Sequence, residues 1–109
     1  EMSETKAEDF EALADMVRGW ATERQIIPNS TPTAQLLKTM SELGELADAT
    51  TKNSKHEITD GVGDVLVCLI NYCALQNIDP VVCLHEAYNQ IKDRKGTLLP
   101  SGVFVKENQ

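Results

Sequence analysis

Five carboxylates occupy two short stretches of the sequence with a spacing that suits metal chemistry. Glu42 and Glu45 are three residues apart, and Glu57, Asp60 and Asp64 follow at intervals of three and four residues. In a helix with about 3.6 residues per turn, each set lies on one face. Carboxylate oxygens are the ligands that Mg²⁺ and Mn²⁺ prefer. The spacing predicts a divalent cation between two acidic helix faces, although such pairs are also common on solvated helices.

Helical periodicity explains how the two acidic faces would meet. Apolar residues recur at helical spacing over four stretches, approximately residues 7–25, 33–50, 55–76 and 79–95. The polar connector between the second and third stretches is short, which predicts an antiparallel hairpin. Glu45 and Glu57 both lie within about two turns of this connector. The acidic faces therefore approach each other near the closed end of the hairpin, where they would repel without a cation between them.

The same pattern predicts an all-α fold with particular boundaries. Residues 27–32 are rich in turn formers and are expected to be a loop. Gly96 is expected to cap the end of the fourth helix, and residues 103–105 favour an extended tail. The third helix is expected to be the most buried, because it has the broadest apolar stripe. This stripe contains Val62, Val65, Leu66, Leu69, Ile70 and Cys73.

Charge and composition restrict the partners. The formal net charge of −7 disfavours nucleic-acid binding, and a phosphate-handling protein of this charge would need a bound cation. The three cysteines have no paired spacing and are interpreted as small buried side chains. Without a signal sequence or a long apolar run, the sequence predicts a cytoplasmic protein with no membrane partner. We expect residues 1–6 to be disordered, with Glu1 a non-native remnant, and residues 7–109 to form one domain.

Several segments carry a family likeness. Residues 37–46, LKTMSELGEL, resemble the first motif of the MazG-like, all-α NTP pyrophosphohydrolases, in which E-x-x-E is followed after a short spacer by E-x-x-D. Glu57 and Asp60 supply the second half of the pattern. Residues 60–66 resemble the helix that follows, and residues 87–96 and 102–107 are similar to small phage and bacterial members. The likeness extends over approximately residues 10–107.

The resemblance implies a four-helix protomer that assembles into a helical-bundle homodimer or homotetramer with Mg²⁺ or Mn²⁺. It implies hydrolysis of an NTP or dNTP to a monophosphate and pyrophosphate in a bacterial cytosol or a phage-infected host cytosol. Purine deoxynucleotides such as dGTP and dATP are the expected substrates. The metal-binding roles transfer to Glu42, Glu45, Glu57 and Asp60.

The sequence departs from the family pattern at two places. Ser41 precedes Glu42 where many members have a second glutamate, and Gly61 stands where many members carry a glutamate that pairs with Asp64. Either the acidic pair has moved one turn back, to Glu57 and Asp60, or Asp64 is also a ligand. Both frames are compatible with helical geometry.

Catalytic and substrate roles follow from the charge of a triphosphate. A carboxylate that is not fully used as a ligand can accept the proton of the attacking water, and Glu42 or Glu45 is the expected base. The expected substrate contacts are Gln35, Lys38, Asn89, Lys92, Arg94 and Lys95. For the three cations after Asn89, stabilisation of a helix C-terminus is an equally good explanation.

Acidic helices also occur in two other classes of protein. A ferritin-like di-metal carboxylate bundle expects Glu-x-x-His pairs, but Glu42, Glu57 and Glu86 are followed three residues later by Glu45, Asp60 and Asn89. A non-enzymatic acidic helical module that binds a protein partner would show no metal-dependent turnover. His56 and His85 are not spaced as ligands with the acidic residues and are interpreted as surface or packing residues.

Overall fold

Five helices and a hairpin of two short strands make up residues 8–107, the part of the chain described by the computed structural model. The helices are α1 (Phe10–Glu23), α2 (Ile26–Asn29), α3 (Pro32–Thr51), α4 (Lys55–Leu75) and α5 (Pro80–Ile91). The strands are β1 (Gly96–Leu98) and β2 (Phe104–Lys106). The predicted all-α class is confirmed. The disorder predicted for residues 1–6 lies outside the described residues.

Side-chain caps fix where the four longer helices begin. Such a cap satisfies a backbone N–H that has no partner within the helix and is typically worth about 1 kcal/mol. Pro32 and Pro80 occupy the first turns of α3 and α5, where a missing N–H costs nothing. The capping side chains are Asp9 for α1, Thr31 for α3, Ser54 for α4 and Asp79 for α5.

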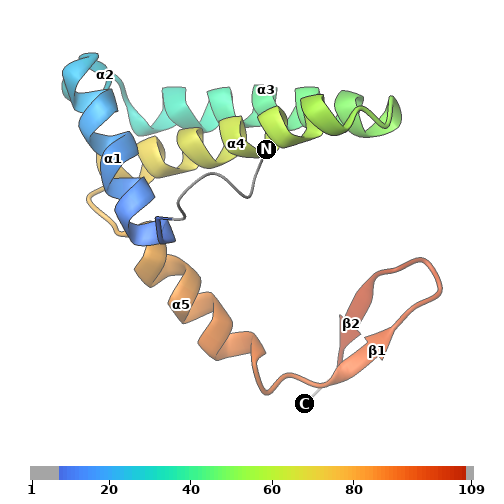
Figure 1. Ribbon diagram of the computed structural model, residues 1–109. Helices are drawn as coiled ribbons and strands as arrows, with labels where there is room; N and C mark the ends of the chain where they lie inside the picture. The colour runs from blue at the N-terminus through green and yellow to red at the C-terminus, as the bar shows by residue number, and fades with distance from the viewer. Residues whose placement is uncertain (1–7, 108–109) are drawn as a thin grey trace.

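The centre of the molecule is the antiparallel pair of α3 and α4, which lie side by side along their length (Figure 1). Asn53 turns the chain between them with a positive φ of 56°. The two helices approach closely at Gly61, where an added Cβ would lie 3.1 Å from Leu46 Cδ1. α1 crosses the other end of this pair (Figure 1). The predicted hairpin is confirmed, and its closed end carries both acidic stretches.

Three boundaries differ from the sequence-based prediction. Residues 26–29 form the short helix α2 instead of a loop, and α5 ends at Ile91 instead of near Lys95. Gly96 begins β1 instead of capping a helix, because this segment pairs with the valine-rich tail in an antiparallel ladder. A side chain at Gly96 would not fit, since its Cβ would lie 2.2 Å from the Val105 carbonyl oxygen.

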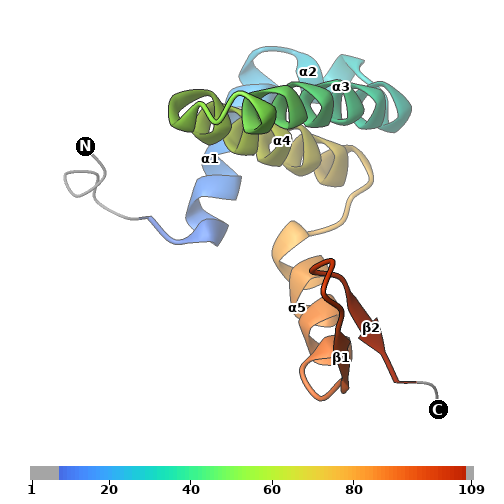
Figure 2. The same ribbon diagram turned by 90° about the vertical axis from the view of Figure 1, so that its right-hand side faces the viewer.

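The protomer is open. α5 and the strand hairpin extend away from the α3–α4 pair as an arm (Figures 1 and 2). The radius of gyration is 16.6 Å, whereas about 13 Å is expected for a compact chain of this length. Large apolar side chains remain exposed on every long helix, including Met16 at 60%, Met40 at 62% and Leu84 at 63%. A single copy therefore leaves much of its apolar surface uncovered.

The prediction that this helix is the most buried is confirmed, since α4 has more buried residues than any other described helix, but its apolar stripe is only partly covered. Ile70 and Cys73 are buried, but Val62, Leu66 and Leu69 are 45%, 40% and 38% exposed. The reason is that α3 covers one side of α4, whereas the shorter α1 covers only the end of α4 that lies opposite the α3–α4 turn. With a mean hydropathy of 1.5, α4 is also the one helix within residues 8–107 long and apolar enough to cross a membrane. Core helices pass the same test, which rests on length and composition alone.

Candidate metal and nucleotide site

Four of the five predicted carboxylates line one open pocket near the closed end of the α3–α4 hairpin. The pocket has a volume of about 290 Å³. Its lining residues are Glu45, Ala49, Glu57, Asp60, Gly61 and Asp64. The acidic stretches of the two helices therefore meet, as the short connector predicted.

Small residues and a helix cap shape this acidic pocket. Ala49 is 2% exposed and Gly61 is buried, so the two helix backbones come close and leave the space to the longer acidic side chains. The Ser54 cap sets the start of α4, and with it the face on which Glu57 lies. A glutamate at position 61, as in many family members, would have to displace Leu46. This close contact favours glycine at position 61 in the present packing of the two helices.

Two of the four acids of the pocket are paired with basic side chains at its rim. Lys52 Nζ lies 3.6 Å from Glu57 Oε1, and His56 Nε2 lies 3.4 Å from Asp60 Oδ2. The interpretation of His56 as a surface residue is confirmed, since it is exposed, but its spacing does bring it to an acidic residue. Among residues 8–107, no three His, Cys, Asp or Glu side chains are gathered tightly enough to hold an ion as they stand. The donor set itself, four carboxylates at one pocket, suits a hard divalent cation.

Glu42 is set apart from this group. It is 7% exposed and does not line the acidic pocket. Its Oε2 lies 3.2 Å from Lys38 Nζ, one turn earlier on α3. The hydrogen bond to Glu42 and the charge of Glu42 raise the pKa of Lys38 above its ordinary value, so this ammonium remains charged. Glu42 and Lys38 thus form a buried carboxylate with its own counter-ion.

The remaining predicted substrate residues are distributed over two distant regions. Gln35 is half-buried near the start of α3, and its Nε2 donates to Ser30 Oγ at 3.0 Å. The others are exposed on α5 and the segment after it, and none of them lines the acidic pocket of the same chain. These arm residues are Asn89, Lys92, Arg94 and Lys95. Since α5 ends at Ile91, the last three do not belong to a helical turn as expected.

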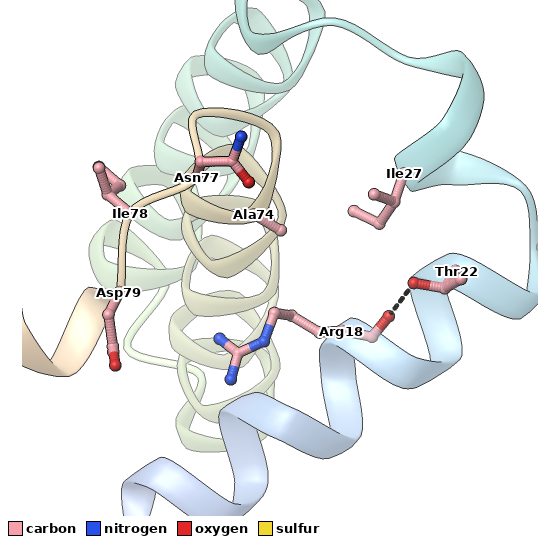
Figure 3. A pocket seen from close by; sticks show the side chains of 7 residues that line it. All are labelled: Arg18, Thr22, Ile27, Ala74, Asn77, Ile78 and Asp79. Atoms are coloured by element: carbon pink, nitrogen blue, oxygen red, sulfur yellow. Dashed lines mark hydrogen bonds between the residues drawn. The ribbon is translucent and has the colours of Figure 1, made fainter.

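A second pocket lies at the opposite end of α4, and the sequence reasoning did not foresee it. It has a volume of about 420 Å³, and Figure 3 shows Arg18 reaching into it from α1. Arg18 also forms an ion pair with Asp15, and its carbonyl accepts a 2.8 Å hydrogen bond from Thr22 Oγ1. The lining residues are Arg18, Thr22, Ile27, Ala74, Asn77, Ile78 and Asp79. The one local sequence signal for this pocket was Asn77, which adopts a φ of 58° in the turn after α4.

The cysteines are free thiols with no place in the acidic pocket. Cys68 and Cys73 are buried, as predicted, whereas Cys83 is exposed on α5. The prediction for Cys83 was wrong because α5 is an arm with little cover in a single copy. Burial is the largest cause that raises the pKa of Cys68 and of Cys73, followed by the charge of Glu42 for Cys68 and the neighbouring Cys83 for Cys73.

A helical protomer with clustered carboxylates between two antiparallel helices defines the class: an all-α protein with an acidic interhelical site. The model of the MazG nucleotide pyrophosphohydrolase domain matches residues 30–97. This match covers more than half of the chain and includes both acidic stretches, so the chain belongs to the MazG family.

Two similar proteins come from phages. An uncharacterized 18.2 kDa protein of Haemophilus phage HP1, from the rep-hol intergenic region, is 34% identical over 74 residues. The match covers 68% of this chain but only 45% of that relative. The cyanophage S-2L MazG-like pyrophosphohydrolase, solved with dGDP and three catalytic Mn²⁺ ions per active site, has a TM-score of 0.69. That likeness covers 94% of this chain and all of the other at 17% identity, and it therefore concerns the fold.

Proposed function

We propose that the chain is a metal-dependent nucleoside triphosphate pyrophosphohydrolase. The observation that carries the proposal is the acidic pocket, in which Glu45, Glu57, Asp60 and Asp64 meet from two helices of a MazG family member. Mg²⁺ or Mn²⁺ is the cofactor that such a donor set suits. The solved S-2L protein, with Mn²⁺ and dGDP in its site, supports the same choice. We expect the enzyme to act in a bacterial or phage-infected host cytosol.

The reaction uses the carboxylates in two ways. Glu57, Asp60 and Asp64 on α4 and Glu45 on α3 would hold the cation, and Glu42 would join them by leaving Lys38. A bound divalent cation supplies the positive charge that offsets the triphosphate and polarises its phosphorus. Glu45, or Glu42 in its place, accepts the proton of the attacking water at a carboxylate oxygen. The water oxygen bonds to the α-phosphorus as the bond to the bridging α–β oxygen breaks, and pyrophosphate leaves with that electron pair.

The products and the substrate range test this proposal. With Mg²⁺, a dNTP should yield monophosphate and pyrophosphate in equal amounts, as separated by ion-exchange chromatography. Purine deoxynucleotides such as dGTP and dATP are the proposed preference, supported by the dGDP bound to the S-2L protein. Orthophosphate as the first product would identify a phosphatase instead. No turnover of any nucleotide in a panel of canonical and modified NTPs and dNTPs would favour the acidic interaction module.

We expect the chain to form a dimer or tetramer in solution. Leu37 and Met40 on α3 are 60% and 62% exposed, and Val62 on α4 is 45% exposed. Burial of such surface is worth about 25 cal/mol per Å², so a second copy is the natural cover for it. Assembly would also offer the arm cations Lys92, Arg94 and Lys95 to the acidic pocket of another copy. A monomer by light scattering at micromolar concentration would contradict this expectation.

The frame of the second acidic motif can be decided by substitution. Glu57, Asp60 and Asp64 all line the pocket, so the two frames differ in role and not in position. We predict that Asp60→Asn and Glu57→Gln lower kcat/KM more than Asp64→Asn, because Asp64 orients a ligand or supports a second ion. Loss of such a supporting group typically costs about 10- to 100-fold. A dead Asp64→Asn variant beside a nearly normal Asp60→Asn variant would establish the other frame.

A further inference from the structure

Three of the five predicted metal ligands are each paired with a basic side chain of the same chain. Lys38 pairs with Glu42, Lys52 with Glu57, and His56 with Asp60. The three acidic partners differ greatly in burial, because the Glu42 side chain is 10% exposed whereas those of Glu57 and Asp60 are 52% and 63% exposed. An exposed pair is solvated with or without its partner and contributes little. The Lys38–Glu42 pair is therefore the one that matters energetically.

A cation close to Glu42 stabilises its buried carboxylate. A buried carboxylate that loses its counter-charge is strongly disfavoured, since water no longer solvates it. Lys38 supplies that charge from a flexible side chain, which is 60% exposed and free to move. The ammonium lies on the same face of α3 as both Glu42 and Glu45, and both acids contribute to the raised pKa of Lys38. Lys38 thus stands beside the acidic pocket on the same helix.

We propose that Lys38 is an exchangeable counter-ion of Glu42. In the metal-free chain its ammonium neutralises Glu42 and keeps this carboxylate out of the acidic pocket. When Glu42 turns to a divalent cation, Lys38 is released and its ammonium becomes available to the substrate phosphates. This inference rests on the proposed function, and it gives Lys38 two roles with opposite consequences: competition with the metal and attraction of the nucleotide.

The test compares two lysine variants that change the net charge equally, from −7 to −8. Lys38→Met removes the buried pair, and Lys52→Met removes the exposed pair at Glu57. Calorimetric titration of each chain with Mn²⁺ alone gives the Kd of the metal without any turnover. We expect Lys38→Met to bind Mn²⁺ about three- to tenfold more tightly than the unchanged chain, because its competitor is gone. Lys52→Met should stay within about twofold, because an exposed pair is weak.

Nucleotide binding should weaken in Lys38→Met, in contrast to the binding of Mn²⁺, which should tighten. At saturating Mn²⁺, the KM for a dNTP should rise in Lys38→Met by about tenfold, the cost of one charged phosphate contact. In chelator, the Lys38→Met chain should melt at a lower temperature than the unchanged chain, and saturating Mn²⁺ should remove this difference. Lys38→Gln keeps a hydrogen-bond donor to Glu42 without the charge. Its Mn²⁺ affinity should therefore lie between that of the unchanged chain and that of Lys38→Met.

Each outcome of the Mn²⁺ titration separates this inference from the proposed function. Unchanged or weaker Mn²⁺ binding in Lys38→Met, with normal binding by the unchanged chain, would overturn the exchange while leaving the metal site intact. Equal tightening in Lys38→Met and Lys52→Met would also overturn it, because net charge alone would then explain the effect. Absence of Mn²⁺ binding by the unchanged chain would overturn the proposed metal site, and the exchange with it.

Discussion

Nucleotide hydrolysis should fall to the uncatalysed background when divalent cations are removed with EDTA, and Mg²⁺ or Mn²⁺ should restore it fully. The reason is electrostatic. The chain carries a net charge of −7 and four carboxylates line its acidic pocket, so nothing in the pocket itself can receive a triphosphate of about four negative charges. Initial rates of pyrophosphate release, measured before and after metal addition, check this prediction.

The same cations should stabilise the folded chain. A ligand that binds only the folded state adds about 2.7 kcal/mol at a hundredfold excess over its Kd. For a domain of about 100 residues this corresponds to a rise in Tm of about ten degrees or more. EDTA loaded beforehand with Mg²⁺ is the matched control and should leave activity and Tm unchanged. Full activity in an excess of free chelator would refute the metal requirement.

Glu45→Gln should be the most damaging single substitution in the acidic pocket. Glu45 lies on the pocket wall, and it is both an expected ligand and an expected proton acceptor. Loss of a positioned general base alone lowers kcat by about 10²- to 10⁴-fold. The side chain is exposed and packs against no apolar core, so the free energy of unfolding should change by only about 0.5 kcal/mol. Steady-state kinetics together with thermal melting separate the two effects.

Asp48→Asn is the control for Glu45→Gln. Asp48 is an exposed acid on the same helix, three residues further on, and it lies outside the acidic pocket. Both substitutions remove one negative charge, so any general electrostatic effect on nucleotide approach is common to both. We expect Asp48→Asn to retain most of the activity. Equal losses in the two variants would show that net charge matters and that the position of Glu45 does not.

The local structure and the family membership follow from the amino-acid sequence alone. Capping residues such as Thr31 and Ser54 set the helix starts, and the i, i+3 spacing of the acids set their helix faces, because both depend only on neighbours along the chain. The short connector then required an antiparallel hairpin, so the meeting of Glu45 with Glu57 and Asp60 was predictable. The same motifs identified the MazG family, which the family match confirms.

Which of these acids share a pocket depends on the three-dimensional packing of the helices. Glu42 and Glu45 lie on one helix face, yet Glu42 is buried beside Lys38 while Glu45 lines the pocket. This difference depends on how α3 packs against α4, a long-range contact that helical periodicity does not encode. The strand hairpin likewise depends on pairing between residues six to ten positions apart, which outweighs local helical propensity in this segment.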